Sequence, residues 1–238
     1  MCTVTLTKSV SGKGFVLTSS RDEAPNRKTL PPDVYSEEGV KMLFPKDAVA
    51  GGTWLGLSER KRLICLLNGE FQKHDRNPPY RLSRGVVVKH LLAVNDLKET
   101  IANYDLHNVE PFTTIVVEWQ QDLRFIEFVW DGKRKHLKNL PITSHIWSSS
   151  PLYSEEMKKQ RETWFEQFRD NNQVSPEKLL EFHFSAGIGD PEVDVRMDRG
   201  FVKTQSISQV VLSEEGISFQ YTDLLTEEVS EMLFSEGL

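Results

Sequence analysis

The chain opens with MCTVTLTK (residues 1–8), in which a cysteine directly follows the initiator methionine. From Cys2 to Lys8 the residues alternate in polarity, and this alternation is typical of a β-strand. A second strand is expected from Phe15 to Asp22, and the stretch Ser11-Gly12-Lys13-Gly14 between them is rich in hairpin-turn residues. The sequence therefore predicts that Cys2 begins the first strand of a β-hairpin.

The register of this hairpin decides which residues lie beside Cys2. With a two-residue loop at 12–13, Cys2 pairs with Glu23. Because side chains alternate across a sheet, Cys2, Arg21 and Glu23 are expected on the same face. Asp22 is expected on the opposite face. A slip of one residue would put Arg21 on the face opposite to that of Cys2, so the prediction depends on the register.

The composition is that of an ordinary soluble globular protein. The chain has 238 residues, of which 38% are hydrophobic and 27% are charged, so it can bury a large core. We expect a single domain over residues 1–238, since no repeat, low-complexity tract or clear boundary interrupts it. The formal net charge of -6 argues against a nucleic-acid partner, because phosphate binding requires a basic surface.

Cysteine usage and hydropathy favour a cytoplasmic protein. Only Cys2 and Cys65 are present, which is too few for a disulfide framework or a cysteine-based zinc site. Neither an apolar leader nor a run of about 18 apolar residues occurs, so we expect no integral membrane segment. Cys65 lies in the apolar run LICLL and is interpreted as a small buried hydrophobic residue. The sequence selects no oligomeric state.

Groups of strands alternate with groups of helices along the rest of the chain. The segment from Ala24 to Asp47 contains four prolines and is interpreted as a long connection and a candidate site loop. Further strands are expected over 51–58, 62–70, 112–119, 124–130, 136–146, 201–212 and 216–221, and helices after Ser83, after Asp96, over 154–171 and from Pro176 to near 187. This order favours an α+β layer architecture over a doubly wound parallel sheet.

Several common functional motifs are missing from the sequence. The stretches GKG and GGTWLG fit neither the GxGxxG nor the GxxxxGK[ST] phosphate loop. There is no GxSxG elbow, and the six histidines include no HExxH pair. We therefore expect neither an α/β serine hydrolase, nor a metal site, nor a cofactor.

Cys2 would combine two catalytic groups once the initiator methionine is removed. Methionine before a small residue is ordinarily cleaved, which leaves a thiol and a free α-amine on one residue. An α-amine titrates at about pH 8 and can serve as the general base for the thiol of the same residue. A nearby cation such as Arg21 would favour the thiolate. From these residues alone, an ordinary cysteine at a strand edge remains the alternative.

Several motifs, in order, resemble the NRDE family, also called the transport and Golgi organisation protein 2 family. They are MCT, SSRDEAPNRKT, AGGTWLG, LLN, SSSPLYSEEMKKQRE, TQSISQVVL and GISFQY, and they span most of the chain. That family is similar to N-terminal nucleophile (Ntn) hydrolases of the penicillin V acylase and bile salt hydrolase branch. The resemblance implies a four-layer αββα sandwich, in which two mainly antiparallel sheets lie between helical layers.

The resemblance also implies catalytic roles for three residues. Cys2 matches the nucleophile, and Arg21 matches the arginine that lies by its thiol. Asn68, at the end of a predicted strand, matches an asparagine whose side-chain amide helps hold the oxyanion. An amide suits that role because it stabilises developing negative charge without changing its own protonation.

The sequence departs from the family pattern at two places. SRDE stands at 20–23 instead of NRDE, and Asp22 directly follows the arginine, whereas the catalytic aspartate of the acylases lies three residues after it. Asp22 is therefore a poor match to that aspartate, and Glu23, on the Cys2 face, could substitute for it. The second oxyanion asparagine of the acylases would fall near WSSSPLY (147–153), where only serines occur.

Two functions follow from the resemblance. In the first, Cys2 attacks a small-molecule amide or acyl substrate, and water hydrolyses the acyl-enzyme. The segment from Leu30 to Phe44 would then shape an acyl pocket, unless it is a plain surface connection. In the second, the fold handles haem or a lipid without catalysis, and any haem is bound reversibly because no CxxCH motif occurs. Cys2→Ser should abolish turnover in the first case and be tolerated in the second.

Overall fold

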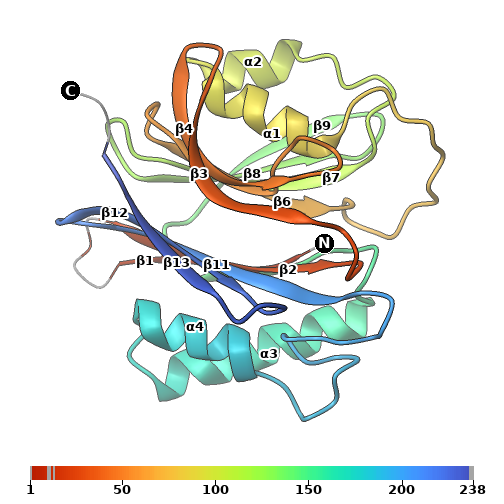
Figure 1. Cartoon of the computed structure of the whole chain (residues 1–238), viewed down its shortest axis with the longest axis vertical. Coiled ribbons are helices and arrows are strands. Elements are labelled where there is room, and N and C mark those ends of the chain that lie inside the picture. The colour runs from red at the N-terminus through yellow and green to blue at the C-terminus, as the bar shows by residue number, and fades with distance from the viewer. Residues whose placement is uncertain (1, 10–11, 13, 236–238) are drawn as a thin grey trace. The chain divides into compact units, whose positions relative to one another are not determined.

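The computed structural model describes residues 2–9, 12 and 14–235, and of Cys2 it describes the backbone. Met1, whose removal is predicted, and the predicted turn residues Ser11 and Lys13 lie outside the described residues. The described chain divides into two compact units, one comprising the chain up to Arg27 with Thr143–Ser235, and one comprising Lys28–Ile142. Each unit contains one antiparallel sheet and two helices (Figure 1), which confirms the predicted α+β class. The single domain over residues 1–238 stays a prediction.

The sheet of the first unit has six strands in the order β10-β1-β2-β11-β12-β13. Their bounds are β1 Cys2–Lys8, β2 Phe15–Glu23, β10 His145–Ser148, β11 Lys203–Ser213, β12 Gly216–Asp223 and β13 Val229–Phe234. β1 pairs with β10, and β2 pairs with β11. The N-terminal hairpin therefore lies between strands that come from the C-terminal part of the chain.

Two helices, α3 (Glu155–Asn171) and α4 (Pro176–Ser185), lie on one face of this sheet (Figure 1). The hydroxyl of Ser154 accepts a hydrogen bond from the backbone N–H of Met157 and so caps α3. Ser175 caps α4 in the same way. Their apolar sides meet in a buried cluster of Val16, Phe165, Leu179, Phe182 and Val195. This packing confirms the predicted amphipathic helices.

The sheet of the second unit has seven strands in the order β3-β4-β5-β6-β7-β8-β9. Their bounds are β3 Thr29–Glu37, β4 Val40–Asp47, β5 Leu55–Ser58, β6 Arg62–Asn68, β7 Phe112–Glu118, β8 Arg124–Trp130 and β9 Lys135–Leu140. Helices α1 (Arg84–Ala93) and α2 (Leu97–Asn103) pack on one face of this sheet. Asp96 caps α2 as predicted, whereas Ser83 precedes α1 without a side-chain capping bond. Cys65 is fully buried in β6, which confirms its predicted structural role.

The AGGTWLG stretch brings the backbone before β5 against the start of α1. A Cβ atom added to Gly52 would lie 2.5 Å from the carbonyl carbon of Gly85, so no side chain fits there. The backbone N–H of Thr53 donates to the carbonyl of Gly85 at 3.2 Å. The glycine at position 52 is therefore required by the close packing of this backbone on the start of α1.

The long connection predicted from Ala24 to Asp47 is wrong, and so is the predicted loop from Leu30 to Phe44. This segment forms the β3–β4 hairpin. Pro31 and Pro32 lie within β3, which is an edge strand, and the pairing shifts across them. Proline lacks an N–H group, so it is tolerated on an edge strand or at a bulge.

Two further predictions of strands are corrected. The strand expected over 136–146 is two strands, β9 and β10, which belong to different sheets. Pro141 lies between them, and a proline does not continue a regular ladder. The C-terminal hairpin carries an unpredicted third strand, β13. Its exposed face carries the apolar Val229 and Leu233, and its other face carries Ser230, so polarity does not alternate along the strand. Over the described part of the chain, no helix is both long and apolar enough to span a bilayer.

Candidate active site

Cys2 and Arg21 are directly opposite each other in the β1–β2 pair. The predicted pairing of Cys2 with Glu23 is wrong by two residues, because the turn is longer than two residues and closes with a 2.8 Å hydrogen bond from Ser9 N to Gly14 O. A shift of two residues preserves the alternation of faces. Arg21 and Glu23 therefore lie on the face of β2 that was predicted.

The guanidinium of Arg21 is buried, with the residue only 3% exposed. Its Nη1 donates to Oε1 of Gln205 at 3.5 Å, and Nε2 of Gln205 donates to the carbonyl of Ala24. Gln205 is the extra residue of a bulge in β11, since the pairing with β2 shifts between Thr204 and Ser206. A bulge redirects a side chain, and here it brings the Gln205 amide to the arginine opposite Cys2.

Glu23 ends β2, and its carboxylate is engaged locally. Oε1 accepts a 3.0 Å hydrogen bond from the N–H of Ala24. Oε2 lies 3.9 Å from Nε of Arg27. Both oxygens thus have partners within four residues of the chain. The part of Glu23 as a substitute for the acylase aspartate stays a prediction.

Asp22 lies on the opposite face of β2, as predicted, and is fully buried. Its Oδ2 accepts a 2.6 Å hydrogen bond from the hydroxyl of Tyr153, and its Oδ1 accepts a 2.7 Å bond from the hydroxyl of Thr204. Burial raises the pKa of the Asp22 carboxyl, and these two hydrogen bonds act against the rise. Asp22 therefore belongs to the helix side of the sheet and not to the face of Arg21.

Arg161 of α3 joins Tyr153 to the start of β1. It is 1% exposed, and its Nη1 donates to the hydroxyl of Thr3 at 2.7 Å. Its guanidinium carbon lies 3.6 Å from the centroid of the Tyr153 ring, within the range of a cation–π contact. Nη2 donates to the carbonyls of Val193 and Asp194 at 3.0 and 2.6 Å. One guanidinium thus holds the residue that follows Cys2.

His183 of α4 joins β1 to β2 from the same side. Its Nε2 lies 2.9 Å from the hydroxyl of Thr5, and its Nδ1 lies 2.8 Å from the hydroxyl of Ser20. The pKa of His183 is lowered to about 3. The larger cause is its complete burial, and the smaller is the nearby charge of Arg161. The imidazole is therefore neutral at physiological pH and acts as a bridge between the two strands.

The serines of WSSSPLY lie beside the start of β1. Ser148 pairs with Thr3 in the β1–β10 ladder. Because the two strands are antiparallel, Ser149 continues the chain toward the end of β1 at which Cys2 lies. Ser149 and Ser150 are 2% and 6% exposed. Their hydroxyl oxygens have no hydrogen-bond partner among the described residues. Buried hydroxyls are usually bonded, so these two donors require an explanation.

Comparison with known proteins identifies the family of this chain. The model of the family described as Transport and Golgi organisation 2 matches residues 1–208. The chain belongs to this family. The resemblance inferred from the motifs is thereby confirmed, whereas a search of curated proteins finds no match.

Three solved structures share the fold of this family member. A variant of conjugated bile acid hydrolase from Clostridium perfringens has a TM-score of 0.60 at 10% identity, covering 98% of this chain and 92% of its own. The Caenorhabditis elegans ortholog of N-acylethanolamine-hydrolyzing acid amidase has a TM-score of 0.59 at 10% identity, covering 98% and 100%. Penicillin V acylase from Agrobacterium tumefaciens has 0.54 at 11% identity, covering 98% and 86%. All three are Ntn hydrolases, which confirms the predicted fold class; at these identities the likeness concerns the fold alone.

The family motifs contain most of the network behind β1 and β2. SSSPLYSEEMKKQRE supplies Tyr153 and Arg161, and TQSISQVVL supplies Thr204 and Gln205. The sequence interpretation missed these four residues as partners, although the motifs that contain them were recognised. His183 lies outside the motifs, and no local pattern distinguished it from the other histidines.

Asn68 belongs to the second unit, whereas Cys2 and Arg21 belong to the first. It is the last residue of β6, as predicted, and pairs with Phe112 of β7. Gly69 follows with a φ of 82°, and its N–H donates to the carbonyl of Pro111 at 3.1 Å. The role of Asn68 at an oxyanion stays a prediction. No set of three or more His, Cys, Asp or Glu in the described ranges is arranged to hold a metal ion.

Proposed function

We propose that the protein is an N-terminal cysteine hydrolase that cleaves a small-molecule amide. The observation that carries the proposal is the direct pairing of Cys2 with a buried arginine, Arg21, in a chain that has the fold of Ntn hydrolases. Residues that face each other in an antiparallel pair belong to the same face of the sheet. A guanidinium at that position would stabilise a thiolate.

The reaction needs Met1 to be removed, so that Cys2 carries a free α-amine. The amine takes the thiol proton, and Sγ attacks the amide carbonyl carbon to form a C–S bond. The C–N bond then breaks, and the ammonium returns the proton to the leaving nitrogen. Next, the amine removes a proton from water, which attacks the thioester and releases a carboxylic acid. The thiol is regenerated, so no cofactor is consumed.

The oxyanion of each tetrahedral intermediate requires hydrogen-bond donors. We assign the hydroxyl of Ser149 to this role, with Ser150 as a second donor. The assignment is supported by their burial, by their lack of a partner among the described residues and by the position of Ser148 opposite Thr3. They would replace the asparagine that the acylases carry in this region. Asn68 is retained as a further donor on the resemblance alone.

The first test is a mass measurement on the full-length protein. Intact mass shows whether Met1 is lost, and brief alkylation with iodoacetamide near neutral pH, followed by peptide mapping, compares Cys2 with Cys65. We expect Met1 to be removed and Cys2 to be labelled selectively, since Cys65 is fully buried. A retained Met1, or a Cys2 that reacts no faster than an unperturbed thiol, would sink the mechanism and favour a non-catalytic role.

Turnover is tested next on a panel of chromogenic acyl amides of different chain length. Cys2→Ser should abolish hydrolysis, whereas the matched variant Cys65→Ser should retain it. Ser149→Ala should lower kcat by about 100-fold with little change in KM, as loss of an oxyanion donor does. An unchanged kcat in Ser149→Ala would remove that residue from the mechanism without affecting the role of Cys2.

A further inference from the structure

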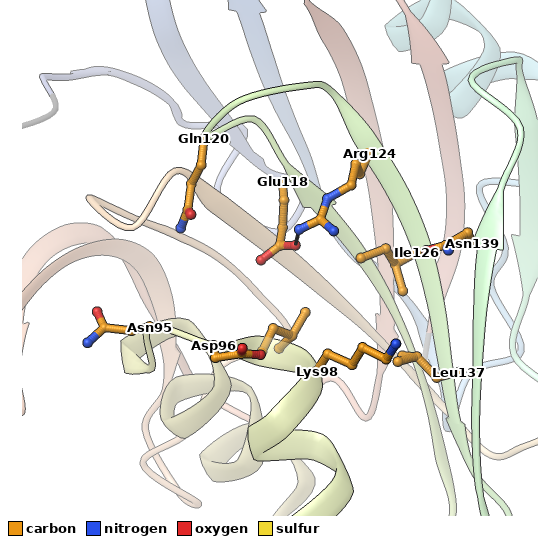
Figure 2. A pocket seen from close by; sticks show the side chains of 10 residues that line it. Asn95, Asp96, Lys98, Glu118, Gln120, Arg124, Ile126, Leu137 and Asn139 are labelled. Atoms are coloured by element: carbon orange, nitrogen blue, oxygen red, sulfur yellow. Dashed lines mark hydrogen bonds and ion pairs between the residues drawn. The ribbon is translucent and has the colours of Figure 1, made fainter.

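A pocket of about 620 Å³ opens in the second unit between the start of α2 and strands β7 to β9 (Figure 2). This volume is in the range of sites that bind small molecules. Leu97 and Ile126 are buried along its lining, and Leu137 of β9 is 39% exposed. The pocket therefore offers an apolar surface that a ligand could cover.

A buried ion pair fixes one wall of this pocket. Glu118, at the end of β7, is 4% exposed, and its Oε1 lies 2.7 Å from Nη2 of the fully buried Arg62. Nη1 of Arg62 donates to the carbonyls of Leu91 and Val94, where α1 ends, at 2.8 and 2.7 Å. Because α2 follows directly after this turn, the ion pair holds the start of α2 against the strands. The pocket is preformed.

The carboxylate of Glu118 is engaged at both oxygens, whereas Lys98 and Arg124 retain N–H groups for a ligand. The second oxygen of Glu118 accepts a 2.5 Å hydrogen bond from Nη2 of Arg124. That bond uses one of the five N–H groups of Arg124. The ammonium of Lys98 and the amide of Asn139 have no partner among the described residues. The side chains of Lys98 and Arg124 are both exposed to solvent, so their N–H groups are available to an anion that enters the pocket.

The balance of charge around the pocket suits a single negative charge. The lining carries two cations, Arg124 and Lys98, and two carboxylates, Glu118 and Asp96, and the buried Arg62 behind Glu118 adds a third cation. Lys98 projects from α2, and Arg124 projects from β8 on the other side of the pocket (Figure 2). The carboxylate of Asp96, which caps α2, would repel a second negative charge. A monoanion fits this arrangement better than a phosphate or a dicarboxylate.

We propose that this pocket binds small aliphatic monocarboxylates. The carboxylate group accepts hydrogen bonds from Lys98 and Arg124, and the hydrocarbon chain covers Leu137 and Ile126. Because the hydrocarbon chain would cover the half-exposed Leu137, the buried apolar surface would stabilise the complex in addition to the charge-assisted hydrogen bonds. The site lies within the second unit and is independent of the proposed chemistry at Cys2.

The test is a titration of the full-length protein with octanoate, followed by calorimetry and by the methyl NMR signals of labelled leucines. Octanoate should bind saturably and shift the Leu137 methyl signals, and 1-octanol and octylamine should bind at least about tenfold more weakly. Lys98→Met should weaken octanoate binding by about tenfold, and Arg124→Gln by a similar factor. Cys2→Ser should leave it unchanged, which separates this site from the proposed active site.

Lys138→Met is the matched control, since Lys138 is exposed and alternates with Leu137 and Asn139 along β9. It removes the same charge from the other face of the strand, and octanoate binding should persist. Equal affinity for octanoate and 1-octanol would overturn the proposal, as would undiminished binding in Lys98→Met. Equal weakening in Lys98→Met and Lys138→Met would also overturn it, because only the net charge would then matter.

Discussion

The hydroxyl of Tyr153 donates a 2.6 Å hydrogen bond to Oδ2 of Asp22, across 131 positions of the chain. The bond joins the segment before α3 to the strand that carries Arg21. The bond also gives a structural role to Asp22, the aspartate of SRDE. This residue stabilises the interior of the first unit and lies on the opposite face of β2 from Arg21. Arg161, stacked on the same tyrosine, extends this link to Thr3 beside Cys2.

Tyr153→Phe should destabilise the protein more above the folded-state pKa of Asp22 than below it. The folded-state pKa of Asp22 is raised above its ordinary value of 3.8, so the cost of burying its charge appears as the pH rises through the folded pKa. The phenol offsets part of that cost by bonding the carboxylate. We expect a loss of about 1–3 kcal/mol above that pKa and a smaller loss below it, measured by urea unfolding over a series of pH values.

The same substitution in an Asp22→Asn background is the control. The asparagine cannot ionise, so the cost of Tyr153→Phe should become smaller and independent of pH. A cost that is equal in both backgrounds would mean that the tyrosine stabilises the fold through packing alone. The double-mutant cycle isolates the pair.

His183→Gln should flatten the acid dependence of stability. The pKa of His183 is about 3 in the folded protein and 6.5 when unperturbed, so between these values only the unfolded chain binds the proton. Stability falls as the pH drops through this window. Between pH 6 and pH 4 the wild-type protein should lose about 2.5 kcal/mol more than the variant, measured by urea unfolding at each pH.

His107→Gln is the matched control, since His107 is exposed. The control should keep the wild-type acid dependence. If both variants showed the wild-type slope, the acid sensitivity would have to come from other groups, and His183 would not be buried in its neutral form.

Arg21→Gln should slow the alkylation of Cys2 at pH 7. Loss of a cation within about 4–6 Å of a thiol lowers the thiolate fraction by about tenfold or more, and the rate with iodoacetamide should fall accordingly. Arg21→Lys should restore part of the rate because it keeps the charge. Continued protection of Cys65 shows that each variant remains folded.

Arg27→Gln removes a neighbouring arginine that contacts Glu23 at 3.9 Å and is 37% exposed. It should leave the rate of Cys2 alkylation nearly unchanged. An equal effect of Arg21→Gln and Arg27→Gln would indicate a general effect of charge and no specific role for the arginine opposite Cys2.

Glu110→Gln should loosen the irregular segment over residues 69–83. The carboxylate of Glu110 is nearly buried and binds Arg76 at 3.0 Å and Arg84 at 3.2 Å, with Nε2 of His74 at 3.6 Å. Loss of its charge removes the ion pairs with Arg76 and Arg84. We expect limited proteolysis within the segment to accelerate by about tenfold, since cleavage follows the population of the open form.

Asp105→Asn breaks the ion pair with Arg81, whose two side chains are 45% and 69% exposed. Exposed pairs of this kind contribute little, so its cleavage rate should stay close to that of the wild type. A similar rate in Glu110→Gln would show that the segment is held by its backbone contacts.

Local periodicity predicted much of the fold. The alternation in β1, the helical spacing of α3, the cap of α2 at Asp96 and the start of α4 at Pro176 all depend on neighbours in the sequence, and the structure confirms them. The face shared by Arg21 and Glu23 was predicted even though the register was wrong, because the error was an even number of residues. The position of Asn68 at the end of β6 also followed from its local pattern.

The features that were missed depend on partners far along the chain. Prolines conceal β3, which is tolerated only as an edge strand. The bulge at Gln205 cannot be recognised without β2 beside it. The contacts of Tyr153, Arg161 and His183 span 131, 158 and 178 positions, and no local spacing specifies such pairs.

The pairing of β2 with β11 also has a consequence during synthesis on the ribosome. β2 ends at Glu23, whereas β11 begins at Lys203, and the whole second unit is translated between them. At bacterial or eukaryotic elongation rates of about 5–20 residues per second, the nascent N-terminal hairpin waits on the order of 10 seconds or longer for its partner strand. During that interval the first residues are not enclosed in a finished sheet, so an aminopeptidase would have time for the proposed removal of Met1 before the strand order around Cys2 is complete.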